Sequence, residues 1–554
     1  MSVKSRLVDV SFEDSTSYVT TSGTDAMGVP FDHPWGPVNK LMYLNQSDFF
    51  SYYPESFPCS ATTISPSRHY AYAQIKKAFS CGADYCEVYR VQGSYQYQEI
   101  LLQGSKKINL KGKVLDTYTP EQQFVKKQFT AISANAAIVS TKYPGFFPQT
   151  LTEKYDGIAL HIVAKDKSID ITIHPMTKSA DQTTPGTDAL KIDEVYYDVV
   201  TSVPFETYSG SIDPNSTDEG RSNFIETLIN AKSSFISVKV NPDYDTLTEL
   251  DAYVGFTPLN TDVRDYPAEP TEDEWKVGLD AFIEGTISNA TLIISPSNNN
   301  LYDEYILNIA NSRQDLQALC AYSPLESFDK ASILTAFQKL SGSKTKFGIY
   351  LAAREDLTIF GQSVASSCAG GWVGTTFNIA KSVRTNQPAS AFTYGGYSGS
   401  LAETLTFDEV CDLHEEGILS IFESSSGSMI WGVRSMHQKQ GSYFGKLNVM
   451  RVLCKILRNV FPICLDAIHT DAASNPITRA TYNVNFNQIL ATEIAAQNIA
   501  SDSYADCGDD VNADKNTNGG EIFNLNLVIH FYKVVERVKI KVTATDSSVT
   551  ATIE

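Results

Sequence analysis

Alternating apolar and polar residues near the start of the chain predict a terminal β-strand. Val8, Val10 and Phe12 alternate with Asp, Ser and Glu, and a stretch rich in Ser and Thr follows over 15–24. Successive side chains of a strand point to opposite faces, so a period of two residues is typical of a half-buried strand. The stretch that follows has the composition of a flexible linker. The segment is therefore expected to be a strand on a tether, with no evident partner close to it in the sequence.

Two segments near the other end alternate in the same way. Residues 523–531 carry Phe, Leu or Ile at every second position, and Val538, Ile540 and Val542 alternate with basic or polar residues. One interpretation is an ordinary hairpin or edge pair within the chain. The other is that the N-terminal and C-terminal strands add to the sheets of neighbouring copies, because an edge strand leaves backbone donors and acceptors open. The pattern alone is compatible with both.

Between the two ends, helical and strand patterns alternate. The helical pattern covers 67–80, 222–232, 272–284, 301–317, 327–340, 407–416 and 444–468. Strand patterns cover 86–91, 158–163, 235–240, 291–294 and 347–352. Alternation of this kind predicts layers of helices packed on sheets, that is, an α/β protein.

The helix expected over 444–468 carries a basic stripe. At about 100° per residue, Arg451, Lys455 and Arg458 fall on one side, Lys446 lies about a turn and a half before them, and the apolar residues of 449–460 fall on the opposite side. The stripe is either a solvated face or a docking surface for an acidic partner. In both cases, reversing the charges of Arg451 and Lys455 is expected to leave the monomer folded.

Composition and charge narrow the class of protein. The chain has 554 residues and a mass of 61.0 kDa, which predicts three or four domains rather than one core. Its 42% hydrophobic and 19% charged residues exclude a disordered or collagen-like chain. The net charge of −20 argues against a general nucleic-acid binder, whose affinity comes from neutralising phosphates.

The sequence also indicates the cellular compartment in which the protein is made. No apolar stretch approaches the roughly 20 residues that span a bilayer, and acidic residues at 9, 13 and 14 stand where a signal peptide needs an apolar core. We therefore expect no membrane insertion, and a chain that is made and kept in a cytosol. The nine cysteines are an odd number and are widely scattered, so they are interpreted as mostly reduced.

A search for catalytic, metal or cofactor motifs finds little. There is no H-E-x-x-H, no C-x-x-C and no G-x-x-x-x-G-K-[ST]. The glycines of 368–374 are interpreted as a tight turn, and those of 394–400, which approach a nucleophile elbow, as a loop. A hydrolase remains as an alternative, with Ser398 or Ser367 and His414 as its only candidates. The prediction is a protein that is not an enzyme, with no catalytic residue, metal or cofactor.

A series of short motifs runs in order along most of the chain. It comprises Trp35-Gly36-Pro37, Tyr70–Phe79 with Gly82-Ala83-Asp84, Tyr143-Pro144-Gly145, Gly157–Val163, Ala369-Gly370-Gly371, Glu416-Gly417-Ile418 and Trp431–Arg434. In order and spacing these segments resemble the contractile tail sheath proteins of bacteriophages, R-type tailocins and, more distantly, type VI secretion systems. Leu419, where Asn is common, and the segment 473–476 depart from the family's pattern.

The resemblance implies a multidomain α/β fold with a central subtilisin-like α/β domain and a C-terminal α+β sheath domain with exchanged terminal strands. The domains expected are an arm and linker over 1–22, an outer α/β region over 23–235 with an insertion at about 92–128, the central domain over 236–428 and the sheath domain over 429–554. A subtilisin-like fold does not by itself imply protease activity, and no catalytic triad is inferred from the resemblance.

The resemblance also implies a function and partners. The chain would form stacked hexameric rings around a tail tube and contract to drive the tube through the host envelope, as part of a virion. Its partners would be further copies of itself, the tail tube protein, and the baseplate and tail terminator proteins. Strand exchange would involve Val8, Val10, Phe12, Val538, Ile540 and Val542, and the tube would be faced by Lys446, Arg451, Lys455 and Arg458.

Overall fold

The computed structural model describes residues 25–55, 66–95, 99–106, 135–143, 157–182, 189–192, 195–218, 220–240, 248–260, 268–340, 345–359, 362–437, 442–512, 521–532, 540–545 and 548–553. The arm and linker predicted over 1–22 lie outside these residues.

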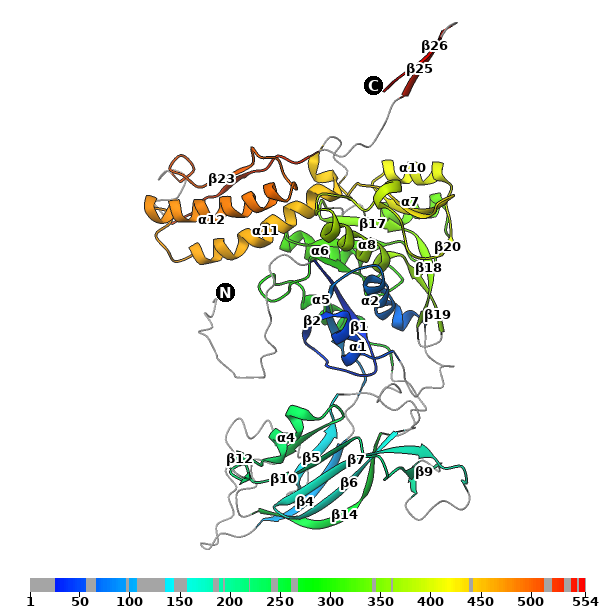
Figure 1. Cartoon of the computed structure of the whole chain (residues 1–554), viewed down its shortest axis with the longest axis vertical. Helices are drawn as coiled ribbons and strands as arrows, with labels where there is room; N and C mark the ends of the chain where they lie inside the picture. The colour runs from blue at the N-terminus through cyan, green and yellow to red at the C-terminus, as the bar shows by residue number, and fades with distance from the viewer. Residues whose placement is uncertain are drawn as a thin grey trace.

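An eight-stranded sheet, here called the central sheet, organises the upper part of the molecule (Figure 1). Its order is β2-β3-β1-β15-β16-β17-β21-β22, and the strands from β3 to β21 are parallel to their neighbours. The edge strands β2 and β22 are antiparallel. The bounds are β1 (Ala26–Asp32), β2 (Leu41–Asn45), β3 (Tyr85–Val91), β15 (Leu292–Ile294), β16 (Gln317–Ala321), β17 (Gly348–Ala352), β21 (Leu419–Ser424) and β22 (Gly427–Trp431).

Helices cover both faces of the central sheet. Because side chains alternate along a strand, Leu319 and Leu351 enter one core, whereas Cys320 and Tyr350 enter the other. The first core is closed by α1 (Gln46–Tyr52), α2 (Tyr70–Ser80) and α8 (Ala369–Ser382). The second is closed by α5 (Glu272–Asp280), α6 (Asp303–Arg313), α7 (Lys330–Lys339) and α10 (Phe407–Glu415). The result is a three-layer α/β/α arrangement, which confirms the α/β class.

Helix α8 corrects one prediction. The glycines of 368–374 do not form a tight turn but lie in the first two turns of this buried helix. They allow the helix to approach α2 closely: a Cβ on Gly370 would lie 2.1 Å from the Gln74 carbonyl oxygen, and one on Gly374 would lie 2.2 Å from that of Ala78. Tertiary packing therefore outweighs the low helix propensity of glycine here.

A second, antiparallel sheet forms a separate layer below the central sheet, here called the β domain (Figure 1). Its path is β13-β5-β4-β14-β6-β7-β9-β8, with β10 paired to β7. The helix α4 (Ile225–Lys232) packs on it and contributes Ile225 and Ile229 to its core. The strands are β4 (Glu99–Lys106), β5 (Asn135–Thr141), β6 (Gly157–Asp166), β7 (Ser168–Lys178), β8 (Leu190–Ile192), β9 (Val195–Val199), β10 (Glu206–Ser211), β13 (Ile236–Val240) and β14 (Thr248–Asn260).

The two sheets place the domain boundaries differently from the sequence prediction. Strands β1 to β3 belong to the central sheet and not to an outer region over 23–235. The boundary expected between 235 and 236 falls inside the β domain, because β13 pairs with β5 along its whole length. Pairing between strands distant in sequence decides both boundaries, and the local pattern does not carry that information.

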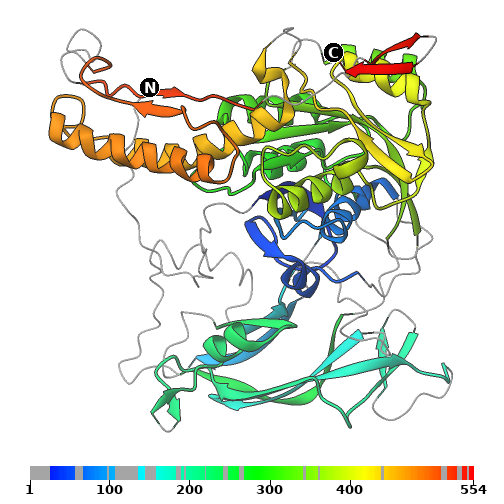
Figure 2. The ribbon, with the colours of Figure 1, turned by 45° about the horizontal axis from the view of Figure 1, so that its top comes forward.

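The C-terminal part begins with two long helices, α11 (Leu447–Ala467) and α12 (Pro476–Ala495). They pack side by side as a helical hairpin, with β23 (Tyr504–Asp506) and β24 (Asn526–Val528) against them (Figure 2). Asn475 caps α12 by accepting from the backbone N–H of Ile477, and Pro476 takes the first helical position, where no backbone donor is needed. Val452 and Ile456 of α11 meet Phe486 and Leu490 of α12.

The chain ends in β25 (Ile540–Thr545) and β26 (Ser548–Ile553), here called the C-terminal hairpin. It stands clear of the body in Figure 1, and within the described residues each strand pairs only with the other. The sequence did not identify β26 as the partner of β25. Part of the segment 523–531 instead forms β24, which pairs with β23.

Smaller elements complete the described chain. These are η2 (Pro66–His69), α9 (Ala391–Tyr394), η4 (Tyr443–Gly445), β11 (Thr217–Asp218), β12 (Arg221–Ser222) and the three-stranded sheet of β18 (Arg354–Ile359), β19 (Gln362–Ser367) and β20 (Leu401–Glu403). None of the helices in the described ranges is long and apolar enough to cross a membrane.

Candidate binding site on helix α11

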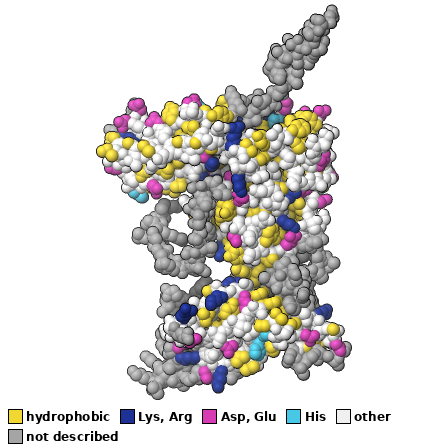
Figure 3. Space-filling model, viewed as in Figure 1, with side chains coloured by type: hydrophobic (Ala, Val, Ile, Leu, Met, Phe, Trp, Pro, Cys, Tyr) yellow, Lys and Arg dark blue, Asp and Glu magenta, His cyan; other side chains and the backbone are white. Residues whose placement is uncertain are grey.

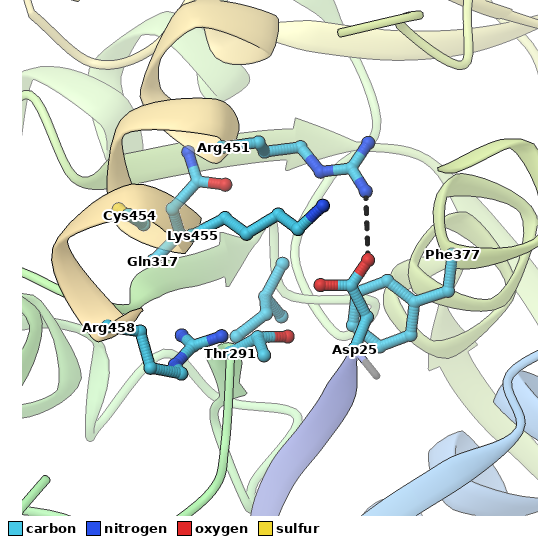
Figure 4. Close-up of a pocket in the computed structure, with 9 residues that line it drawn as sticks. Asp25, Thr291, Gln317, Phe377, Arg451, Cys454, Lys455 and Arg458 are labelled. Carbon is cyan, nitrogen blue, oxygen red and sulfur yellow. Dashed lines mark hydrogen bonds and ion pairs between the residues drawn. The ribbon is translucent and has the colours of Figure 1, made fainter. Parts of the chain in front are cut away.

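Three basic side chains of α11 line one small pocket. Arg451, Lys455 and Arg458 extend from the helix toward Asp25, which precedes β1, and toward Thr291 beside β15 (Figure 4). Leu292, Gln317, Phe377 and Cys454 complete the lining. We call this the basic pocket. The prediction that the three cations share one side of the helix is confirmed by this arrangement.

Arg451 is the most deeply placed of the three, with 8% of its surface exposed. Its Nη2 lies 3.4 Å from Asp25 Oδ2 and 3.5 Å from the backbone oxygen of Thr376. Burial lowers the pKa of the guanidinium, and the nearby Asp25 carboxylate partly offsets the effect. Both contacts are long for charge-assisted hydrogen bonds, so the charge is only loosely compensated.

The other two cations join α11 to different parts of the chain. Lys455 Nζ lies 2.8 Å from Glu493 Oε1 on α12, and Glu493 in turn accepts from the side-chain amide of Asn498 at 2.6 Å. Arg458 donates to the backbone oxygen of Asp315, which precedes β16, and its Nε lies 3.6 Å from Asp315 Oδ2. The basic side of α11 thus ties the helical hairpin to the central sheet.

This arrangement corrects the expectation of an outward-facing stripe. Arg451, Lys455 and Arg458 turn toward their own chain, because acidic partners are supplied by the segments before β1 and β16 and by α12, which the sequence pattern does not bring to the helix. Lys446 is half-buried outside the basic pocket, and burial together with Arg434 lowers its pKa. The assignment of all four residues to a tube-facing surface stays a prediction.

The residues predicted for strand exchange fall into two groups. Val8, Val10, Phe12 and Val538 lie outside the described residues. Ile540 and Val542 lie in β25, where the register places them opposite Ile553 and Ala551 of β26. Their pairing with another copy stays a prediction.

The apolar surface of the helical hairpin was not predicted from the sequence. Phe461, Leu465 and Ile468 at the end of α11 are 47–55% exposed, and on α12 Ile477 is 80% and Val484 57% exposed. Hydrophobic side chains are visible over this part of the molecule in Figure 3. Exposed apolar groups that gather in one region are typical of interaction surfaces. The signal was available, since the apolar positions of α11 continue past residue 460 on more than one face.

The candidate residues for a hydrolase do not form a catalytic arrangement. Ser367 is buried, and its hydroxyl is 2.5 Å from that of Tyr70. In the part of the chain that the structure describes, neither Ser367 nor Ser398 makes a hydrogen bond with a histidine, and no group of three metal-ligating side chains occurs. His414 lies on α10, where burial and Arg434 lower its pKa to about 4.

Comparisons with known proteins give no match at the level of sequence families. No protein-family model matches the chain, and no curated protein sequence matches it.

Solved structures do match. A sheath tail protein of Listeria innocua superposes with a TM-score of 0.54 at 12% identity, covering 96% of this chain and 94% of its own. One from Desulfitobacterium hafniense gives 0.48 at 13% identity, covering 90% and 93%. The helical sheath of the anti-feeding prophage in its contracted state gives 0.46 at 10% identity, covering 98% and 100%. The first of these shows a common fold over nearly the whole of both chains.

Proposed function

We propose that this chain, which has the fold of a sheath tail protein, is the structural subunit of a contractile tail sheath. It polymerises as stacked hexameric rings around a tail tube and contracts to drive the tube through the host envelope. The observation that carries the proposal is the fold shared with the Listeria innocua protein over 96% of this chain. The resemblance of the ordered motifs points in the same direction, although fold alone does not fix function.

The proposal includes the place of the protein and its partners. The chain belongs to the tail of a virion and assembles with further copies of itself. It also contacts the tail tube protein, the baseplate proteins and the tail terminator protein. The central sheet and its helices correspond to the subtilisin-like domain of the family, without catalytic residues, and the part from α11 onward corresponds to the sheath domain.

The C-terminal hairpin supports a polymer held by exchanged strands. A two-stranded hairpin alone is at best marginally stable in water, and three or more strands are needed for independent stability. Within the described residues β25 and β26 pair only with each other, so each keeps one open edge. The register sets Ile540, Val542 and Ala544 opposite Ile553, Ala551 and Val549. Strands from neighbouring copies, including the segment of Val8, Val10 and Phe12, would complete this sheet.

Contraction requires two packed arrangements of the same subunit. Rigid bodies would slide and rotate while the strand connections hold, with the extended arrangement as the metastable one. The central sheet with its covering helices is suited to move as one rigid body and the β domain as another. Each has its own hydrophobic core.

Electron microscopy of the purified protein tests the proposal. We expect long hollow cylinders with six-fold symmetry, formed by the chain alone or on added tail tubes. A discrete particle that never polymerises, and that is labelled by a fluorophosphonate, would contradict it and favour the hydrolase alternative.

A further inference from the structure

The side of α11 that packs on the central sheet continues beyond the sheet. At about 100° per residue, Phe461 and Leu465 fall on the same side of the helix as Cys454 and Arg458. Cys454 is 3% exposed and belongs to a core of the central sheet, whereas Phe461 is 47% and Leu465 49% exposed. Figures 1 and 2 show the reason, because the second half of α11 extends past the central sheet. We call Phe461, Leu465 and Ile468, which follows the helix and is 55% exposed, the apolar end of α11.

The residues that precede Asp25 start close to this surface. Asp25 lines the basic pocket together with Cys454 and Arg458, so it lies on the same side of α11 (Figure 4). Phe461 follows Arg458 by only about 5 Å along the helix axis. An extended chain from Asp25 back to Phe12 spans about 40 Å. The residues around Phe12 are therefore within reach of the apolar end of α11 of the same chain.

The composition of residues 4–12 suits such a surface. Val8, Val10 and Phe12 occupy alternate positions, and Lys4 and Arg6 precede them at the same spacing. In a strand all five side chains would lie on one face, because alternate side chains point the same way. That face would be apolar on the side nearer to Asp25 along the chain and basic farther from it.

The end of α11 carries the complementary charge. Asp466 and Asp471 are exposed, and neither Lys nor Arg occurs over 459–475. Outward from the basic pocket, α11 thus presents apolar side chains first and carboxylates near its end. Residues 4–12 present apolar side chains first and cations next when followed outward from Asp25. Complementary charges in this order favour a single orientation of the two segments.

We propose that the apolar end of α11 binds residues 4–12 of its own chain in the unassembled subunit. The side chains of Val8, Val10 and Phe12 cover it and remove its apolar surface from water. Because the two segments belong to one chain, the effective concentration of the ligand is high, and a small contact is enough.

The binding competes with assembly, and this consequence rests on the proposed function. In the polymer the same three apolar side chains would pair with another copy, so residues 4–12 must leave α11 when the subunit joins a ring. The binding within the monomer does not depend on the sheath function.

Photo-cross-linking of the full-length monomer tests the proposal. Phe461→p-benzoylphenylalanine keeps an aromatic side chain at a position that is half exposed. We expect irradiation to join residue 461 to residues 4–12, as located by tandem mass spectrometry. The same replacement of Phe392, which is 64% exposed on α9, is the matched control and should give no product with residues 4–12. Absence of the product from residue 461 would overturn the proposal.

Isotope mixing identifies the chain that supplies the bound residues. The monomer is prepared with ¹⁵N and without it, and the two preparations are combined before irradiation. If the chain binds its own residues 4–12, each cross-linked pair of peptides should carry one isotope only. Pairs that combine both isotopes would show that a second copy covers the apolar end of α11, and the proposal would then be wrong.

A charge within residues 4–12 should release them. Val10→Asp in the full chain should lower the yield of the cross-link at least fivefold and raise the fluorescence of the apolar dye anilinonaphthalene sulfonate. Val19→Asp, outside residues 4–12, is the matched control and should change neither. A tenfold preference for the bound segment alters the melting temperature of a chain of this length by only about 1 °C, so both variants should stay folded. Equal yields in the two variants would contradict the proposal.

The same cross-link reports on assembly. In tubes formed by the chain, its yield should fall at least fivefold relative to the monomer, because residues 4–12 have moved to another copy. An undiminished yield within single chains of the tube would show that these residues do not leave α11, and the proposed competition would be wrong. If the monomer gives the cross-link but never forms tubes, the proposed sheath function fails while the binding within the chain stands.

Discussion

Asp25 and Arg451 are 426 positions apart in the sequence, yet Arg451 Nη2 lies 3.4 Å from Asp25 Oδ2. The pair joins the residue before β1 to the second turn of α11. It therefore links the point where the N-terminal segment enters the central sheet with the helical hairpin of the C-terminal part. The contact between the two elements is made by a buried guanidinium.

Reversing this charge should destabilise the monomer. In Arg451→Glu a buried carboxylate would face Asp25, so we expect the free energy of unfolding to fall by about 3 kcal/mol. Urea denaturation followed by circular dichroism measures the change. Arg221→Glu, at an exposed position in β12, is the matched control and should cost less than about 0.5 kcal/mol. A fully stable Arg451→Glu monomer would restore the solvated-stripe interpretation that the sequence suggested.

Deleting residues 1–20 should prevent assembly but leave the subunit folded. If the strand of Val8, Val10 and Phe12 pairs with another copy, the truncated chain should keep its melting temperature but form no tubes by negative-stain microscopy. The deletion ends before Asp25, so the contact with Arg451 is retained. Normal tubes from the truncated chain would rule out exchange by this arm.

Removing the C-terminal hairpin should also prevent assembly while the rest of the subunit stays folded. Because β25 and β26 pair only with each other in the described chain, truncation after residue 532 should leave the thermal unfolding of the body unchanged. Sedimentation velocity should then show that assembly is lost. A drop in melting temperature of several degrees would mean that the hairpin packs on its own subunit.

Close contact between α2 and α8 should be sensitive to a single methyl group. Gly374→Ala would place a Cβ 2.2 Å from the Ala78 carbonyl oxygen, and relieving that overlap should cost about 1–3 kcal/mol of stability. Gly396→Ala meets no atom within 4 Å and is the control. Equal stability of the two variants by thermal denaturation would show that the helices separate easily.

Acid should destabilise the protein through His414. Partial burial and the nearby Arg434 lower its pKa to about 4 in the folded chain, from 6.5 ordinarily. Between these values the unfolded chain binds a proton that the folded chain does not, so stability falls as pH falls from 6.5 to 4, by about 2 kcal/mol. His414→Gln should reduce the slope of stability against pH in this window, measured by urea denaturation at several pH values. An unchanged slope would show that His414 is accessible to protons in the folded state.

The sequence determined the local elements and the fold class of this protein. Helical periods around 70–80, 330–339 and 407–415 correspond to α2, α7 and α10, because an amphipathic pattern and cap residues such as Thr406 act within a few residues of one another. The order of the motifs likewise led to the sheath fold, which the structural comparison supports.

Tertiary structure alone decided how these elements are combined and where the charges of α11 point. The glycines of α8 are helical because α2 requires close approach, and β1 to β3 join the central sheet because β1 pairs with β15. Arg451, Lys455 and Arg458 share a stripe by sequence, but their partners Asp25, Glu493 and Asp315 come from three other segments. Contacts between residues hundreds of positions apart leave no periodic trace in the chain, so the basic pocket became visible only in the folded molecule.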